Sequence, residues 1–309
     1  WYRSRGLGDV YKRQFHNYML RPVFIEAALN GPWSQRRQPL MPVTTDALIA
    51  EGIDCARAGA SVIHIHVYDP DTGQQFENFD AYKEVIEGIR EYEDVIVYPT
   101  VPLSGFGKTD QTFSAEARFK TVEKLAKAGL LEWSVIDPGT TQITELDPTN
   151  SEQVQFLYIN SEAEIRYGLE LASRYDFVPS FAIYEPGFLR LGAMLFRNTK
   201  GCPRPIYRFM FSDKLSFGFP AEEIYLLAYI DLLKQINPEA VWMIAGLQVN
   251  LRRIIGTCLE GGGHIRTGLE DSYFYSEIGN LDLVRQTAKI VLNENYEIGT
   301  AAQLRQQLA

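Results

Sequence analysis

The segment SVIHIHVYDP, residues 61–70, places two histidines one residue apart inside a run of valine and isoleucine. Such a β-branched run favours a buried strand, in which successive side chains point to opposite faces. His64 and His66 then share one face, while Ile63 and Ile65 share the other and pack against neighbouring elements. A buried imidazole needs a hydrogen-bond partner or a metal, so this pair requires an explanation beyond packing.

Seven further β-rich runs alternate with helical segments along the rest of the chain. The eight strands are predicted at 22–29, 61–67, 94–100, 131–137, 177–185, 205–211, 241–246 and 262–269. The helices are predicted at 44–58, 78–91, 114–129, 161–174, 187–197, 221–236, 249–259, 279–294 and 301–308, the first of them capped by Thr45.

Strands that alternate with helices indicate a parallel sheet, and eight such units at this length match a closed (β/α)8 TIM barrel. A doubly wound open sheet is the alternative fold. It would require a G-x-G-x-x-G loop after the first strand, where the chain instead reads LNGPWSQ. The sequence therefore predicts an α/β protein with a TIM barrel.

The composition is that of an acidic globular protein, with 309 residues, 46% of them apolar and 22% charged, and a net charge of −9. No Lys/Arg run is dense enough to follow a phosphate backbone, which argues against nucleic-acid binding. No apolar run reaches the roughly 18 residues of a transmembrane helix. The three cysteines form no C-x-x-C pair, which favours a reducing, cytoplasmic location.

The first 18 residues differ in character from the rest. They show neither a helix or strand period nor the apolar core of a signal peptide. Their string GLGDVYKRQ resembles a translated adapter sequence. Residues 1–18 are therefore expected to be a non-native leader, and residues 19–309 are expected to form a single barrel domain.

The two histidines lie near the carboxyl end of their predicted strand, where the active sites of TIM barrels are built. From that position an H-x-H pair can place two imidazoles on one metal ion. The alternative is a pair of core histidines, each satisfied by a hydrogen bond. A third histidine of the predicted barrel, His264, begins the last strand.

That last strand runs into the segment HIRTGLED, residues 264–271, in which Arg266 and Glu270 share one parity with His264. Glu270 falls just past the strand end, where it can supply an oxygen ligand beside the two imidazoles. Two nitrogens, one carboxylate and an open position suit a catalytic zinc. Glu270 and Asp271 can equally belong to a helix cap or a solvated loop. An interior Arg266 needs a carboxylate partner, either of these two or an anionic substrate.

Three segments together resemble the β-keto acid cleavage enzymes: VIHIHVYDPDTG (62–73), VIVYPT (95–100) and GGGHIRTGLED (261–271). The resemblance extends from about residue 22 to the C-terminus. It implies a TIM barrel, a divalent metal that is normally zinc, and a homo-oligomer. It also implies a β-keto acid and acetyl-CoA as substrates, with acetoacetate and a new acyl-CoA as products.

The resemblance assigns roles to six residues. The metal ligands are His64, His66 and Glu270. Arg266 and Asp271 match the family's catalytic arginine and aspartate, and Asp271 is the expected general base. Thr100 matches the position of a catalytic serine, although a β-branched residue is also an ordinary way to end a strand.

The sequence departs from the family pattern at positions that are expected to touch the substrate side chain or CoA. Trp33 replaces an acid after the first strand, Val135 replaces a threonine, and Ala182 replaces a glutamate. The segment SDKLSFGFP, residues 212–220, replaces a glycine-rich loop, and Glu185 is a possible polar contact. Metal binding and catalysis are therefore expected to be retained, and the specificity for an amino-substituted substrate is not.

Two other functions remain open. A metal-dependent C–C lyase or hydrolase can use the same barrel without CoA, because one fold supports many chemistries. A metal-bound protein without catalytic activity is the third possibility. Imidazole and carboxylate ligands also admit divalent metals other than zinc.

Overall fold

The computed structural model describes residues 21–102, 114–150 and 153–309. The proposed leader, residues 1–18, lies outside the described part of the chain. Within that part, eight parallel strands follow the order β4-β3-β2-β11-β10-β9-β8-β5. The strands β4 and β5 at the two ends of this order also lie in contact, so the sheet curls into a nearly closed barrel. The predicted TIM barrel is confirmed.

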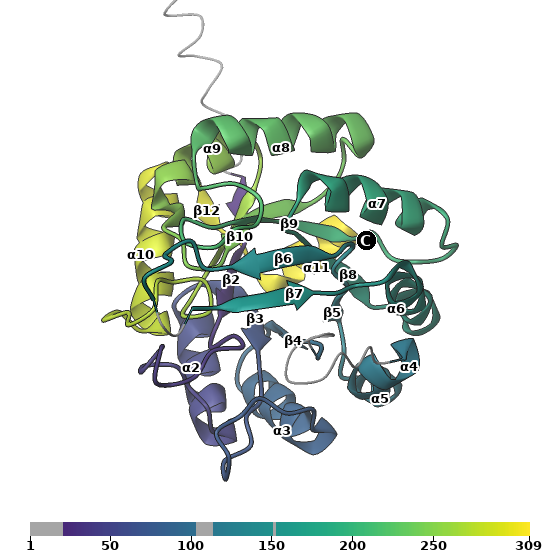
Figure 1. Cartoon of the computed structure of the whole chain (residues 1–309), viewed down its shortest axis with the longest axis vertical. Helices are drawn as coiled ribbons and strands as arrows, with labels where there is room; N and C mark the ends of the chain where they lie inside the picture. The colour runs from purple at the N-terminus through teal and green to yellow at the C-terminus, as the bar shows by residue number, and fades with distance from the viewer. Residues whose placement is uncertain (1–20, 103–113, 151–152) are drawn as a thin grey trace, which may run out of the picture.

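Each of the eight predicted strands is present. Their bounds are β2 Ile25–Ala28, β3 Ala60–Ile65, β4 Ile96–Pro99, β5 Trp133–Val135, β8 Val178–Ile183, β9 Ile206–Phe211, β10 Trp242–Gly246 and β11 His264–Thr267. A second small sheet pairs β1 (Pro22–Val23) with β12 (Glu297–Ile298). Figure 1 shows the helices arranged around the barrel strands.

The helices also follow the predicted order. Their bounds are α2 Thr45–Arg57, α3 Phe79–Arg90, α4 Ala115–Arg118, α5 Lys120–Lys127, α6 Glu162–Tyr175, α7 Pro186–Arg197, α8 Glu223–Ile236, η1 Leu251–Ile254, α9 Ile255–Glu260, α10 Asn280–Asn293 and α11 Ala301–Leu308. No helix in the described residues combines the length and the apolar character needed to cross a membrane.

Two local predictions about the helices were wrong. Thr45 is the first helical residue of α2, whereas Thr44 has extended dihedral angles and caps the helix by accepting a hydrogen bond from the Ala47 amide. The predicted helix 114–129 is divided into α4 and α5, because Phe119 departs from helical geometry at φ −93° and ψ 10°.

A β-hairpin between β5 and α6 was not predicted from the sequence. Its strands are β6 (Thr141–Thr144) and β7 (Gln155–Tyr158), which pair antiparallel. In Figure 1 the hairpin crosses in front of the barrel strands. It brings Ile143, Phe156 and Tyr158 to the pocket described below.

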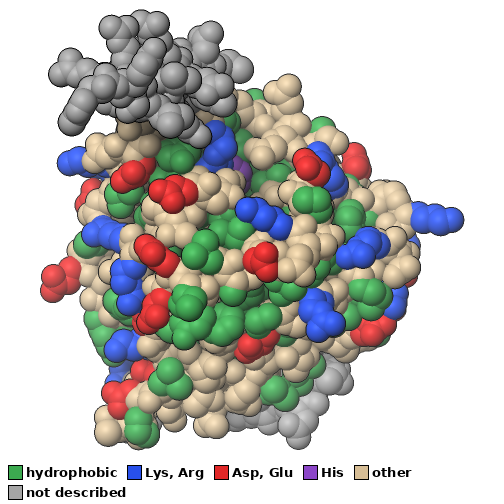
Figure 2. Space-filling view, turned by 90° about the horizontal axis from the view of Figure 1, so that it is seen from above, with side chains coloured by type: hydrophobic (Ala, Val, Ile, Leu, Met, Phe, Trp, Pro, Cys, Tyr) green, Lys and Arg blue, Asp and Glu red, His purple; other side chains and the backbone are tan. Residues whose placement is uncertain are grey.

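The barrel strands bury apolar side chains on their outer face and polar ones inside. Ile63 and Ile65 are fully buried in the core, whereas the alternate residues of the same strand face the barrel axis, as the two-residue period requires. Residues on the face seen in Figure 2 carry mixed charge, with Lys/Arg and Asp/Glu side chains interspersed among apolar ones.

Candidate functional site

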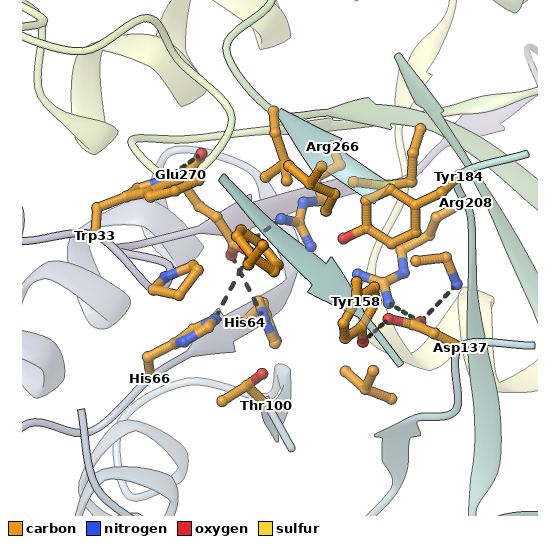
Figure 3. A pocket seen from close by; sticks show the side chains of 17 residues that line it. Trp33, His64, His66, Thr100, Asp137, Tyr158, Tyr184, Arg208, Arg266 and Glu270 are labelled. Atoms are coloured by element: carbon orange, nitrogen blue, oxygen red, sulfur yellow. Dashed lines mark hydrogen bonds and ion pairs between the residues drawn. The ribbon is translucent and has the colours of Figure 1, made fainter. Parts of the chain in front are cut away.

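A pocket is formed by residues from the barrel strands, the loops that follow them and the β6–β7 hairpin. Figure 3 shows the 17 side chains that line it. They include five of the six residues to which the resemblance assigns a role, namely His64, His66, Thr100, Arg266 and Glu270, whereas Asp271 is absent from the lining. The carboxyl ends of barrel strands are where TIM-barrel enzymes carry out catalysis.

His64, His66 and Glu270 converge in this pocket. His64 belongs to β3, His66 follows that strand, and Glu270 follows β11. The two Nε2 atoms lie 3.2 Å apart. Glu270 carboxylate oxygens lie 3.5 Å from His64 Nε2 and 3.6 Å from His66 Nε2. All three side chains are buried, and one ligand atom from each lies within 4.8 Å of the others.

These distances fit a divalent cation. In a tetrahedral site with metal–ligand bonds of about 2.0 to 2.1 Å, neighbouring ligand atoms are separated by roughly 3.3 Å. Burial lowers the pKa of His64 well below its usual value and so favours the neutral imidazole that binds metals. His66 Nδ1 lies 2.8 Å from Gln75 Oε1. Donation to Gln75 leaves the Nε2 lone pair of His66 available to a metal.

The backbone around the three ligands is held by hydrogen bonds. The side chain of Asn30 donates to the carbonyl of His66 over 2.8 Å and accepts from its amide over 3.0 Å. The Glu270 amide donates to the carbonyl of Ala28 over 3.2 Å, and Trp33 Nε1 donates to the Glu270 carbonyl over 2.9 Å. The loop after β2 and the end of β2 thus position candidate ligands that follow β3 and β11 in the chain.

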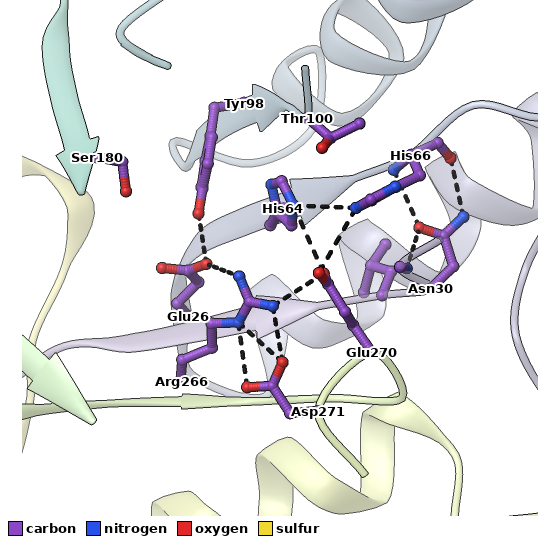
Figure 4. Close-up of polar contacts among 12 residues, drawn as sticks. Glu26, Asn30, His64, His66, Tyr98, Thr100, Ser180, Arg266, Glu270 and Asp271 are labelled. Atoms are coloured by element: carbon purple, nitrogen blue, oxygen red, sulfur yellow. Dashed lines mark hydrogen bonds and ion pairs between the residues drawn. The ribbon is translucent and has the colours of Figure 1, made fainter. Parts of the chain in front are cut away.

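Arg266 is the hub of the buried ion pairs (Figure 4). Its Nε and Nη2 bond to Asp271 with a shortest distance of 2.7 Å, and Nη2 lies 2.9 Å from Glu270 Oε2. Its Nη1 donates to Glu26 over 3.3 Å. Arg266 therefore pairs with both of the carboxylates expected from the sequence, Glu270 and Asp271. It also pairs with Glu26, which was not identified from the sequence.

The pKa values of the two neighbouring acids, Glu270 and Asp271, are shifted in opposite directions. Burial opposes ionisation of Glu270, but the Arg266 guanidinium and the nearby imidazoles outweigh it and hold the pKa of Glu270 well below its usual value. Burial dominates at Asp271 and raises its pKa above the usual value. Asp271 lies beside a second cavity, also lined by Arg266, so that Arg266 stands between Asp271 and the main pocket.

Thr100 follows β4 and lines the main pocket, as does each of the three family departures Trp33, Val135 and Ala182. The Thr100 side chain is buried, and its hydroxyl donates to the Val101 carbonyl over 3.3 Å. Because Thr100 lines the pocket, its hydroxyl can be proposed as a hydrogen-bond donor to the substrate.

Two other departures support the hairpin and do not line the main pocket. Glu185 accepts hydrogen bonds from the Thr141 hydroxyl and the Gly218 amide, each over 3.1 Å. Ser216 donates through its amide to the Thr144 carbonyl over 2.9 Å. Glu185 and the segment 212–220 thus fasten β6 to the loop after β9. The expected polar contact from Glu185 to a substrate is not supported by this position.

The wall of the pocket that faces the three ligands carries a second group of polar residues. Arg208 belongs to β9, and its Nη2 lies 3.8 Å from Asp137 Oδ1. Asp137 accepts from the Ala182 amide over 3.0 Å and from the Tyr158 hydroxyl. Neither Arg208 nor Asp137 was identified from the sequence. The sequence did carry a signal for both: Arg208 lies inside the predicted buried strand 205–211, and Asp137 ends the predicted strand 131–137.

His264, by contrast, belongs to the core. It is buried, its ring packs at 4.5 Å from that of Phe24, and its Nδ1 accepts from the Phe24 amide over 3.3 Å. Burial lowers the pKa of His264 to about 3, so the ring is neutral. The histidine therefore takes the ordinary structural role that was the alternative for the pair in β3.

The chain is similar in sequence to several named enzymes over nearly its whole length. The chain is 23% identical over 306 residues to 3-dehydrocarnitine:acetyl-CoA trimethylamine transferase of Rhizobium meliloti, covering 94% of this chain and 97% of that protein. It is 24% identical to the 3-keto-5-aminohexanoate cleavage enzyme of Fusobacterium nucleatum, covering 94% and 99%. It is 26% identical to 3-oxoadipate:acetyl-CoA acetyltransferase of Cupriavidus necator, covering 93% and 94%.

Among solved structures, the binary complex of ObcA with oxaloacetate superposes with a TM-score of 0.69 at 15% identity. The match covers 87% of this chain and 67% of that one, and at such an identity it shows the fold alone. The sequence model of the beta-keto acid cleavage enzymes matches residues 22–309. The chain belongs to the β-keto acid cleavage enzyme family.

Proposed function

We propose that the protein is a zinc-dependent β-keto acid cleavage enzyme that uses acetyl-CoA and yields acetoacetate and a new acyl-CoA. The observation that carries this proposal is the convergence of His64, His66 and Glu270 in the barrel pocket of a chain of this family. The choice of substrates is supported by the names of three relatives, two of which name acetyl-CoA and two of which name a keto or oxo acid.

His64, His66 and Glu270 would hold the cation, which would supply Lewis acidity to the ketone of the substrate. Arg266 fixes the orientation of Glu270 through the contact at 2.9 Å and keeps its carboxylate charged. Thr100 lines the same pocket and offers its hydroxyl to a substrate carboxylate or to a developing oxyanion.

Asp271 is the proposed proton acceptor. Arg266 holds its carboxylate through two nitrogens and thereby sets its orientation. Because Asp271 faces the second cavity, we propose that the proton from the substrate reaches it through water in that cavity. The raised pKa of the buried Asp271 carboxyl makes it a stronger base than an exposed aspartate.

The exchange balances without water and without a redox partner. Proton removal turns the α-carbon of the keto acid into a nucleophile, which forms a bond to the acetyl carbonyl and expels the CoA thiolate. The thiolate then attacks the original ketone carbon, and the bond between that carbon and the α-carbon breaks. The acyl group leaves as a thioester, and protonation of the α-carbon gives acetoacetate.

A panel of β-keto acids, incubated with and without acetyl-CoA, tests the proposal. We expect acyl-CoA and acetoacetate to form in equal amounts, and only when acetyl-CoA is present. Cleavage that does not depend on the thioester would instead support a metal-dependent lyase or hydrolase. Absence of turnover on every acid, in a protein that still binds metal, would support a binding role.

The Asp271→Asn variant tests the base. It removes the basic carboxylate while keeping a side chain of the same shape beside Arg266. We expect metal binding to persist and turnover to fall by about 100-fold or more. Unchanged turnover would contradict the assignment. The cytoplasmic location and the homo-oligomeric state expected from the sequence stay predictions.

A further inference from the structure

We propose that Arg208 selects the substrate, by donating hydrogen bonds to an oxygen acceptor at the end of the keto acid that lies farthest from the metal. This inference rests on the proposed function, because it assigns the chemical class of the acid bound in the same pocket. The class is a β-keto acid whose distal end carries an oxygen, either uncharged or as a carboxylate, rather than a methyl group or an ammonium.

The Arg208 guanidinium is buried but poorly satisfied. The residue is 2% exposed, and among the described residues its Nε has no hydrogen-bond partner. Within the described part of the chain, its guanidinium makes one hydrogen bond, from Nη2 to the Ser180 carbonyl over 3.5 Å. The nearest carboxylate oxygens, of Asp137 and Glu26, lie at 3.8 Å and 4.0 Å. A guanidinium carries five N–H groups, so most of its donor capacity is unused.

The neighbouring acid has no comparable deficit. One Asp137 oxygen accepts from the Ala182 amide over 3.0 Å, and the other accepts from the Tyr158 hydroxyl. These bonds hold the carboxylate in place and leave its contact with Arg208 longer than a hydrogen bond. The group on this wall that still needs a partner is therefore a donor, and the ligand that completes it is an acceptor.

The position of Arg208 suits the distal end of a substrate. Figure 3 shows Arg208, Asp137 and Tyr158 on one side of the pocket and His64 with its fellow ligands on the other. An acid anchored at the metal side thus extends its chain toward Arg208. The wall that encloses such a chain is largely apolar and includes Val135, Ile143, Phe156, Met210 and Leu247.

The charges around the wall refine the class. An ammonium at this position would face the Arg208 guanidinium, and like charges in a buried site repel strongly. A methyl group would leave the buried donors without an acceptor. A carboxylate would satisfy them but would add a charge beside Asp137, whereas a hydroxyl or carbonyl oxygen satisfies them without this cost. We therefore expect the uncharged oxygen to be preferred over the carboxylate.

The test uses four β-keto acids of equal chain length that end in a methyl, hydroxyl, carboxylate or ammonium group. With the metal-loaded protein and acetyl-CoA, we expect the hydroxyl-ended acid to exceed the methyl-ended and ammonium-ended acids in kcat/KM. In Arg208→Met the ratio of hydroxyl-ended to methyl-ended acid should fall about tenfold to hundredfold, as loss of a charged donor predicts. Met210→Leu changes the same wall without removing a donor and should keep the wild-type ratio.

Arg208→Met removes the cation beside the buried Asp137 carboxylate, which destabilises the fold, so the double variant Arg208→Met/Asp137→Asn is made in parallel. It should show the same loss of ratio. A preference for the methyl-ended or ammonium-ended acid, or an unchanged ratio in the folded variants, would overturn the inference.

Binding without acetyl-CoA separates this inference from the proposed function. Calorimetry of the four acids on the wild type and on Arg208→Met reports recognition whether or not any acid is cleaved. Tighter binding of the hydroxyl-ended acid that depends on Arg208, with no turnover, would support the inference and contradict the proposed function. Turnover of all four acids without any role of Arg208 would do the reverse.

Discussion

Gly31→Ala tests how closely the backbone approaches the metal site. Gly31 has φ +73°, and a Cβ added there would lie 2.9 Å from the Cβ of Glu270 and closer still to its Cγ. Carbon atoms in ordinary contact are about 3.5 to 4.0 Å apart, so the Glu270 side chain must move by more than about half an ångström. Metal sites tolerate about 0.2 Å in ligand distance.

We therefore expect Gly31→Ala to weaken metal binding about 10- to 100-fold, the range found when the support of a ligand is lost. The variant also places an alanine in the left-handed region, which costs about 1 to 2 kcal/mol of stability. Metal affinity is measured by competition with a chromophoric chelator, and the free energy of unfolding by denaturant titration.

Gly73→Ala is the matched control. Gly73 has φ +66°, and an added Cβ there would meet nothing within 4 Å. It carries the same backbone cost without touching a ligand, so stability should fall and metal affinity should not. Wild-type metal affinity in Gly31→Ala, with stability reduced as in the control, would refute the assignment of Glu270 as a ligand in this geometry.

Three further variants test other contacts of the site and its surroundings. Arg266→Lys should retain metal, because a positive charge stays beside Glu270. It should lose most turnover, because an ammonium cannot reproduce the two-pronged contact of a guanidinium with Asp271; steady-state kinetics and metal analysis check this. Gln75→Leu removes the acceptor 2.8 Å from the imidazole Nδ1 and should weaken metal binding about 10- to 100-fold in the chelator assay. Burial opposes the charged form of Asp213, but hydrogen bonds from Tyr273, the Asn250 amide and Arg253 together outweigh it and lower the pKa of Asp213. A lowered folded-state pKa stabilises the protein above the unfolded-state pKa of about 3.9 and loses this effect as pH falls, so the stability gap between wild type and Asp213→Asn should close in acid.

The barrel and the three candidate metal ligands were predictable because each is encoded locally. The eight strands are short apolar runs between helical segments, and the alternation of side chains along a strand places His64 and His66 on one face. Glu270 could be added because it ends a segment that alternates in the same way. The structure brings these three side chains together, as predicted.

The remaining site residues depend on tertiary contacts that a single strand does not reveal. Glu26 and Arg208 each interrupt an apolar strand, but their meaning comes from partners on other strands, at 3.3 Å from Arg266 and 3.8 Å from Asp137. The hairpin was missed because its strands have four residues each and are only partly buried, so their apolar period is weak. The cap of α2 was misplaced by one residue because two threonines are adjacent.

Because charged side chains inside the barrel share ion-pair partners, replacing one of them affects the others. Arg266 forms ion pairs with Glu26, Glu270 and Asp271. Its charge therefore affects the protonation of both the proposed metal ligand Glu270 and the proposed base Asp271. Removing one partner of a buried ion pair leaves an uncompensated charge, which is strongly destabilising. Conservative replacements such as Asp271→Asn therefore separate chemical roles from structural ones better than truncation to alanine does.

The metal content of the purified wild type and of His66→Ala tests the central claim most directly. Elemental analysis of the wild type should find one divalent metal ion, expected to be zinc, for each chain, because two imidazoles and one carboxylate converge at distances that fit a single ion. His66→Ala removes one of these ligands and should lose the ion. A wild type without metal, or a full complement of metal in His66→Ala, would contradict the account.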